Sequence, residues 1–206
     1  MSCRETPTAS EPPALGLRER KKLKTRRAIR RAAYRLFAEQ GYAATAVDQI
    51  AEAAEVSPST FFRYFPTKED VVLDDEYAPV LGEALKSRPA DEPIVDAIRH
   101  ALTDSPARLV GAERDELLFR TRLAVTVPAI RARAADEQRR SQDAVAALIV
   151  DRTGREPDDL DVHCAAAAII AVFSSVVRYW TEGGGSEDLA ELYDRQLALL
   201  ATGLRI

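Results

Sequence analysis

Histidine and cysteine, which supply most metal ligands and many nucleophiles, are nearly absent from this 206-residue chain. It has two histidines, His100 and His163, and two cysteines, Cys3 and Cys164. This number and spacing fit neither a zinc site nor a disulfide framework. His163 and Cys164 are adjacent, and adjacent side chains point about 100° apart on a helix, so they do not form a nucleophile and its base. We therefore expect no catalytic residues, no metal site and no cofactor.

Phosphate loops and membrane segments are missing as well. The densest glycine cluster, at residues 183–185, follows no strand pattern and precedes no Gly-Lys-Ser/Thr. No unbroken apolar run has membrane-spanning length, and the first residues, MSCRETPTASEPPALG, are polar and contain prolines, unlike a signal peptide. We expect a soluble cytoplasmic protein without a membrane partner, and a disordered tail at residues 1–16.

Alanine, leucine, arginine and glutamate dominate the composition, and no segment alternates apolar and polar residues as a strand would. These features predict an all-α fold of about nine helices. Proline and glycine separate the predicted helices. The first helix ends at Gly41, a long helix runs from Lys68 to about Lys86 with a kink or break at Pro79, and further helices cover residues 94–103, 107–126, 129–152, 159–181 and 187–204.

Positive charge is concentrated at the N-terminal end. Residues 1–68 carry 13 Lys+Arg against 7 Asp+Glu, whereas residues 69–206 carry 16 against 26. A basic segment on an acidic remainder is expected when only that segment meets phosphate. We predict that Arg18 to Arg27 lie along a DNA backbone or enter a minor groove as an arm. The alternative is a solvated helix face.

The stretch from Thr45 to Lys68, TAVDQIAEAAEVSPSTFFRYFPTK, contains three helix starts in a short span. Thr45 is predicted to cap the first helix, with Asp48 at the reciprocal position. Glu55 and Val56 form the turn that follows. The spacing predicts a helix-turn-helix, although any small helical bundle also has capped short helices.

The second helix of this pair begins at Ser57, an N-cap residue followed by Pro58 at the first helical position. Pro66 ends it after about two turns, and Thr67 caps the next helix with Asp70 three residues on. Its first turn carries small hydroxylated residues, which fit a helix that enters a major groove.

The segment GYAATAVDQIAEAAEVSPSTFFRYFPTKEDVV resembles the DNA-binding domain of the tetracycline-repressor (TetR) family, and the likeness covers roughly residues 20–72. It implies an N-terminal helix-turn-helix domain at residues 17–67 and a C-terminal helical domain for effector binding and dimerisation at residues 68–206. The DNA contacts that it implies are Thr45, Ser57, Pro58, Ser59, Thr60, Phe62, Arg63, Tyr64 and Lys68.

The chain departs from the family pattern at four positions among or near these contacts. Members usually have tyrosine at Phe62, histidine at Tyr64, threonine at Ala46 and glycine at Glu55. Glu55 must either adopt an awkward backbone conformation or sit in a different turn. Its negative charge is also unfavourable near phosphate.

Residues 159–181 are apolar on more than one face and residues 187–204 carry a wide leucine face. Such helices suit an intersubunit four-helix bundle, or else the core of a monomer, and the TetR resemblance favours a homodimer. Candidate ligand-lining residues are Arg120, Leu123, Val127 and Phe173; for Arg120 the alternative is a solvated helix edge.

The segments FFRYFPTKEDVV and LAVTVPAIRAR also resemble actinobacterial regulators grouped with the mycofactocin regulator, which implies an apolar, acyl-chain effector. The sequence as a whole predicts a ligand-responsive DNA-binding regulator, a dimeric repressor released from a palindromic double-stranded operator by a small molecule. The alternatives are a small helical enzyme and a helical scaffold that does not bind DNA.

Overall fold

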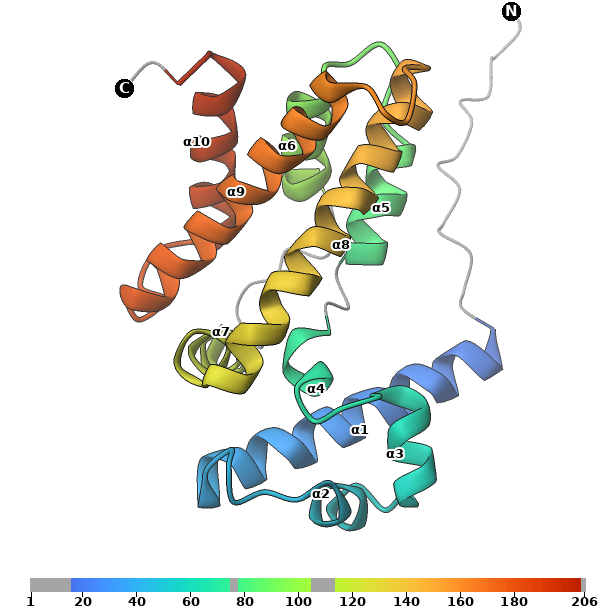
Figure 1. The fold of residues 1–206 in the computed structure, drawn as a ribbon, viewed down its shortest axis with the longest axis vertical. Helices are drawn as coiled ribbons and strands as arrows, with labels where there is room; N and C mark the ends of the chain where they lie inside the picture. Colours follow the sequence, from blue (N-terminus) through green and yellow to red (C-terminus); the bar gives the residue numbers. More distant parts are fainter. Residues whose placement is uncertain (1–15, 75–77, 105–113, 205–206) are drawn as a thin grey trace, which may run out of the picture.

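The computed structural model describes residues 16–74, 78–104 and 114–204, and over these residues it contains ten helices and no strand (Figure 1). The predicted all-α fold is therefore confirmed, with one helix more than expected. The helices are α1 Leu17–Gln40, α2 Val47–Ala53, α3 Pro58–Tyr64, α4 Asp70–Leu73, α5 Ala78–Lys86, α6 Ile94–Asp104, α7 Arg114–Thr126, α8 Pro128–Thr153, α9 Leu160–Glu182 and α10 Leu189–Ala201.

Helices α1 to α4 form a small unit at one end of the molecule, below the other helices in Figure 1. Its core contains Ile29, Phe37, Ile50, Phe61 and Phe65, all of which are buried. Val71 and Val72 of α4 belong to the same core, and Ile130 of α8 closes it from above. The domain boundary at residues 67/68 stays a prediction, but the packing joins α4 to the N-terminal unit.

Helices α5 to α10 form the second unit. Helix α9 packs between α8 and α10, and α10 also packs on α6. Trp180 anchors the turn between α9 and α10, because its Nε1 donates to the Glu187 carbonyl at 2.9 Å. Gly185 is required in this turn: its φ is +70°, and a Cβ atom there would lie 2.9 Å from the Trp180 ring.

The predicted start of α3 is confirmed, whereas α4 begins later than predicted, at Asp70 with Glu69 and not Thr67 as its N-cap. Ser57 caps α3 by accepting a hydrogen bond from the Thr60 backbone N–H at 3.1 Å, with Pro58 at the first helical position. Thr67 and Asp70 bond reciprocally: the Asp70 carboxylate accepts from the Thr67 N–H at 2.8 Å, and Thr67 Oγ1 accepts from the Asp70 N–H at 3.3 Å. Local side-chain chemistry therefore defines both ends of the recognition segment.

The predicted cap at Thr45 is wrong. Helix α2 begins one residue later, with Ala46 as its N-cap, and the side chain of Gln49 accepts from the Ala46 N–H at 2.9 Å. Thr45 is instead buried, and its hydroxyl donates to the Gly41 carbonyl at 2.8 Å. Because the Thr45 hydroxyl bonds to the preceding turn, it does not cap α2, and the Gln49 side chain bonds to the N-cap residue instead.

The predicted long helix at residues 68–86 is also corrected. Helix α4 ends at Leu73, Asp74 has an extended backbone, and α5 begins at Ala78. Pro79 thus lies in the first turn of α5, where a proline costs no hydrogen bond. The break that the proline predicts is present, but it precedes the proline.

The remaining predicted helices at 94–103, 129–152, 159–181 and 187–204 match α6, α8, α9 and α10 to within three residues. The start of the helix predicted at 107–126 lies outside the described residues, as do residues 1–15 of the predicted tail. By length and composition alone α9 would suffice to cross a membrane, although Ser174, Ser175 and Arg178 interrupt its apolar run. It packs against α8 and α10, as core helices of soluble proteins also do.

Candidate DNA-binding interface and domain junction

Helix α3 presents a hydroxyl-rich first turn to solvent. Ser57, Pro58 and Ser59 are exposed and Thr60 is half-buried. The Ser57 hydroxyl lies 2.9 Å from both Ser59 Oγ and Thr60 Oγ1. These linked hydroxyls can donate to or accept from base edges and phosphates, which is the role that the first turn of a recognition helix plays.

The second turn of α3 combines one buried and one exposed aromatic ring. Phe61 is fully buried, whereas Phe62 keeps 50% of its surface exposed and meets the Phe61 ring edge to face at 5.5 Å. Arg63 is exposed, and its guanidinium lies 5.4 Å from the Tyr64 ring centre. Phe61 therefore anchors α3 to the core while Phe62 and Arg63 remain available to a partner.

Lys68 is held by the loop in front of α2. Its Nζ donates to the carbonyls of Tyr42 and Thr45, both at 2.8 Å, and lies 4.2 Å from the Tyr42 ring centre. The Tyr42 hydroxyl in turn donates to Glu69 at 2.7 Å. Burial and this hydrogen bond raise the pKa of Tyr42. Burial acts to raise the pKa of the Glu69 carboxyl, but the bond from Tyr42, together with other hydrogen bonds and the charge of Lys68, lowers it. The cluster ties the starts of α2 and α4 together.

The turn between α2 and α3 contains the strain that its sequence suggested. Glu55 has a φ of +56°, in the left-handed region that glycine occupies without cost. The side chain is exposed. Glu55 therefore adopts the left-handed conformation itself, and the turn keeps the geometry of a helix-turn-helix.

A charged cluster connects the two units at the end of α4. Asp74 accepts hydrogen bonds from Arg26, with Nε at 2.8 Å, and from Arg30, with Nη2 at 2.6 Å. Its backbone carbonyl accepts from Arg120 of α7 at 3.3 Å. Arg30 is only 3% exposed, so this carboxylate balances a buried cation. Helix α1 is thereby fixed to the segment that leads into the second unit.

Comparisons with known proteins agree with this geometry. Residues 29–74 match the family of bacterial regulatory proteins of the tetR type, and residues 92–205 match the MftR C-terminal domain of TetR proteins. The HTH-type transcriptional regulator TcmR of Streptomyces glaucescens is 37% identical over 182 residues, which cover 84% of this chain and 79% of that protein.

The chain belongs to the TetR family of transcriptional regulators. Solved structures of TetR proteins share its fold. Thermus thermophilus FadR, crystallised with lauroyl-CoA, is 29% identical with a TM-score of 0.57, and the alignment covers 88% of this chain and 95% of that one. FadR of Bacillus halodurans, at 22% identity, has a TM-score of 0.55 with 88% and 96% covered, which shows the fold.

As in other TetR regulators, the helix-turn-helix is the DNA-binding element, but the individual contacts stay predictions. The structure brings Ser57, Ser59, Thr60, Phe62 and Arg63 together on one short helix. Two other predicted contact residues are less available. Thr45 is 1% exposed with its hydroxyl bonded internally, and the ammonium group of Lys68 already has two carbonyl partners. A DNA contact by either residue has to coexist with these bonds.

The predicted ligand-lining residues of this TetR protein fall in two places. Leu123 and Val127 pack on the N-terminal core, and Arg120 bonds to Asp74 at the junction. Phe173 lies on α9, where its ring centre is 4.8 Å from that of Tyr193. Their shared role as ligand contacts therefore stays a prediction. His163 and Cys164, adjacent on α9, are both exposed.

Sequence reasoning missed the residues of the domain junction. Arg30 shares the buried face of α1 with Ile29 and Ala33. An arginine on the apolar face of a helix requires an acidic partner, which is the signal that could have found Asp74. Arg133 of α8, bonded to Asp70 at 2.8 Å, gave no such signal because it stands in an ordinary polar run.

Proposed function

We propose that this TetR protein works in the cytoplasm as a homodimer that binds a palindromic operator through α3. The observation that carries the proposal is the surface of α9. This helix has a mean hydropathy of 2.0 over its most apolar window, yet only 22% of that window is buried within the chain. Surface of this kind is covered in solution by a partner, and a second copy gives the two-fold symmetry that a palindrome requires.

The exposed apolar positions identify which part of α9 a partner would cover. Ala171 is exposed near the middle of the helix and Tyr179 is 56% exposed toward its end. Leu197 of α10, in contrast, is fully buried in the core of its own chain. The interface we propose therefore uses the outer face of α9, and Leu197 supports it from behind.

We further propose that an apolar small molecule in the α5–α10 unit lowers operator affinity. Thermus thermophilus FadR, the 29% identical relative, binds lauroyl-CoA, which favours acyl-chain compounds as the first candidates. The response would pass through α4, which contacts both α7 and α8 as well as α1. A ligand that prefers the state in which the two α3 helices miss their half-sites would weaken binding by about 5–150-fold.

Thermodynamic reciprocity provides the test of this switch. Candidate acyl-CoA compounds are titrated into the protein with and without a selected operator duplex. The proposal predicts that the duplex weakens ligand binding by the same factor as the ligand weakens duplex binding. A ligand whose affinity is the same with and without the duplex would leave a DNA-binding dimer that this compound does not control.

A further inference from the structure

Arg26 of α1 lies between the domain junction and the end of the recognition helix. Its Nε donates a hydrogen bond to Oδ2 of Asp74 at 2.8 Å, and its Nη2 donates to the other oxygen of the same carboxylate. Its guanidinium carbon lies 5.1 Å from the centre of the Phe65 ring. One side chain of α1 therefore contacts both the segment that follows α4 and the residue that ends α3.

The two contacts use different parts of the planar guanidinium group. Asp74 accepts from Nε and Nη2 along one edge, and such a paired bond fixes the orientation of the plane. The group lies over the Phe65 ring within the ~6 Å at which a cation and an aromatic face attract each other. A lysine has neither the planar edge nor the planar face that make these contacts. The position therefore requires arginine in particular, and a positive charge alone does not suffice.

Phe65 connects this contact to the recognition helix. It is the C-cap residue of α3, and its backbone N–H donates to the Phe61 carbonyl at 2.9 Å. Both rings are fully buried, and their centres are 6.0 Å apart. Phe62 and Arg63, which lie between them in sequence, are exposed and are predicted to contact DNA. A displacement of Phe65 would therefore change the direction in which Phe62 and Arg63 meet a groove.

Asp74 supplies a fixed point at the other end of this contact. Its carboxylate also accepts from Arg30 at 2.6 Å, and its backbone carbonyl accepts from Arg120 of α7 at 3.3 Å. Arg30 is 3% exposed, so its bond to Asp74 is not open to competition from water. Arg26 is therefore oriented by a residue that α1 and α7 both hold in place.

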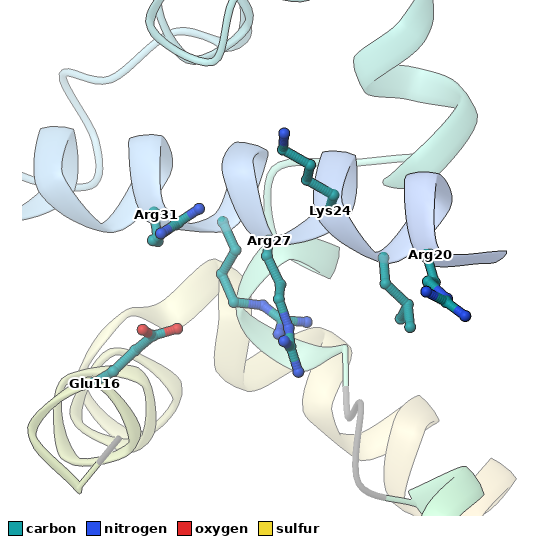
Figure 2. Close-up of a pocket in the computed structure, with 7 residues that line it drawn as sticks. Arg20, Lys24, Arg27, Arg31 and Glu116 are labelled. Atoms are coloured by element: carbon teal, nitrogen blue, oxygen red, sulfur yellow. The ribbon is translucent and has the colours of Figure 1, made fainter. Parts of the chain in front are cut away.

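The basic residues of α1 do not form a single surface. At the cleft between α1 and α7, Figure 2 shows Arg20 and Arg27 extending toward the side on which α7 and α8 lie, whereas Lys24 extends toward the opposite side. The direction of Arg26 is set by its bonds to Asp74, and 28% of its side chain is exposed. A place in the basic run does not by itself make Arg26 a DNA contact.

We propose that Arg26 is a positioning residue for operator binding, which holds the C-terminal end of α3 in register with the junction and does not itself bind DNA. A movement of Asp74 would then reach α3 through Arg26, so that a ligand in the α5–α10 unit could alter operator reading along this path. This last step rests on the proposed function. The effect of Arg26 on operator binding needs no ligand, and the unsubstituted protein shows separately whether the operator is bound.

Fluorescence anisotropy on the full chain without ligand measures binding to two duplexes over a range of salt concentrations. One duplex is an operator selected by the unsubstituted protein, and the other is its shuffled sequence. Arg26→Lys keeps the charge and loses both contacts, whereas Arg26→Gln also removes the charge. The control is Lys22→Gln, which removes a charge from an exposed position one turn earlier on α1. Circular dichroism and urea denaturation report the fold and stability of each variant.

Arg26→Lys should weaken operator binding about tenfold, within the ~5–150-fold that loss of one good base contact costs. Its affinity for the shuffled duplex should not change. Arg26→Gln should show the same loss on the operator and an unchanged salt dependence on the shuffled duplex. Lys22→Gln should weaken binding to both duplexes alike and reduce the salt dependence by about one per chain, as expected for a phosphate contact.

A double-mutant cycle tests whether Arg26 acts through the Phe65 ring. Phe65→Leu removes the ring and keeps a buried apolar side chain. Arg26→Lys should then add little to the loss of operator affinity that Phe65→Leu causes alone. The control is Phe37→Leu, a buried aromatic residue of the same core whose ring neighbours are Tyr34 and Tyr42. The losses caused by Phe37→Leu and Arg26→Lys should multiply.

The proposal fails on any of three results. A reduced salt dependence in Arg26→Gln, matching that of Lys22→Gln, would make Arg26 a phosphate contact. Lower stability of Arg26→Lys with unchanged operator affinity would leave Arg26 a purely structural role. Losses that multiply between Arg26→Lys and Phe65→Leu would show that Arg26 does not act through the end of α3.

Discussion

Arg133 of α8 donates a hydrogen bond from Nη2 to Oδ1 of Asp70 at 2.8 Å. The other carboxylate oxygen of Asp70 accepts from the backbone N–H and the hydroxyl of Thr67. One aspartate therefore caps the segment after the recognition helix and at the same time ties it to the second unit. Because α8 and α9 pack together, a shift of α9 would reach α4 through this pair.

The Asp74 cluster should dominate the stability of the junction. We expect Asp74→Ala to lower the free energy of unfolding by about 2–4 kcal/mol, since removing one partner of a fully buried pair costs ~3–5 kcal/mol and Asp74 keeps 20% of its side chain exposed. Urea denaturation measures the change. Asp48→Ala, at an exposed position of α2, is the control and should change stability by less than ~0.5 kcal/mol. Equal losses of stability in Asp74→Ala and Asp48→Ala would show that the cluster does not dominate the stability of the junction.

Replacing Glu55 should raise the free energy of unfolding rather than lower it. Glu55→Gly should stabilise the protein by about 0.5–1 kcal/mol, because relief of the left-handed backbone exceeds the entropic cost of glycine. It should also strengthen DNA binding by removing a negative charge. Glu52→Gly, three residues earlier on α2, has no strain to relieve and should destabilise by a similar amount. A destabilising Glu55→Gly would show that the turn is not strained.

Phe62 should read a thymine methyl group. An exposed aromatic ring on α3 has no hydrogen bond to offer a base, but it can contact the 5-methyl group in the major groove. Replacing the contacted thymine by uracil should weaken binding of the unsubstituted protein about fourfold, equivalent to one buried methyl group. The same replacement should not affect Phe62→Ala. If no thymine in the operator behaves in this way, Phe62 contacts the backbone instead.

The proposed dimer interface can be separated from the core of each chain. Ala171→Glu, at an exposed position of α9, should give a folded monomer with reduced operator affinity, because the interface would bury an unpaired charge. Ala90→Glu in the exposed turn between α5 and α6 should leave the dimer intact. Sedimentation velocity reports the mass and circular dichroism the fold. The substitution Leu197→Asp would not be informative, because a charge at this buried position should unfold the chain itself.

The bond between Tyr42 and Glu69 predicts a pH dependence. The Glu69 pKa is lowered from 4.5, so its contribution to stability is present above pH 4.5 and is lost as the pH falls through the lower, folded value. Tyr42→Phe removes the largest of the interactions that lower this pKa. The difference in unfolding free energy between the two proteins should be constant from about pH 6 to 8 and shrink below pH 4.5.

Tyr34→Phe is the matched control for this experiment. The Tyr34 hydroxyl donates to the Val71 carbonyl at 3.4 Å, and no carboxylate is its partner in that bond. Burial, opposed by Arg120 and Arg30, raises the pKa of Tyr34 to about 12, well outside the range studied. Its effect on stability should therefore not vary between pH 3 and 8. A parallel pH dependence in both variants would assign the change to other carboxylates.

The elements that the sequence predicted well are those with local causes. Ser57, followed by Pro58, caps α3 through a bond from the Thr60 N–H, and the predicted bond between Thr67 and Asp70 is present in the turn that leads into α4. The Thr45 cap failed because a contact outside the local pattern prevailed: the Thr45 hydroxyl turned back to Gly41, and Gln40 donates to it from the preceding helix at 3.1 Å.

The domain junction could not be predicted for a different reason. Asp74 meets Arg26 and Arg30 across more than forty positions of sequence, and Arg133 meets Asp70 across sixty-three. Such pairs depend on how whole helices pack, which periodicity does not determine. The sequence predicts that the basic run from Arg18 to Arg27 forms a single DNA-facing surface. The structure divides it, since Arg26 pairs with Asp74 whereas Lys21 and Lys22 are exposed.

The most direct test of the account is a comparison of two duplexes of equal length and composition. One is a palindrome selected from genomic fragments by the protein, and the other is its shuffled sequence. Fluorescence anisotropy at fixed salt should show one dimer on the palindrome, at least ~10³-fold tighter than on the shuffled duplex, and Arg63→Ala should relax the preference at one position in each half-site. Equal affinity for both duplexes, or binding of one chain per palindrome, would contradict sequence reading by paired α3 helices.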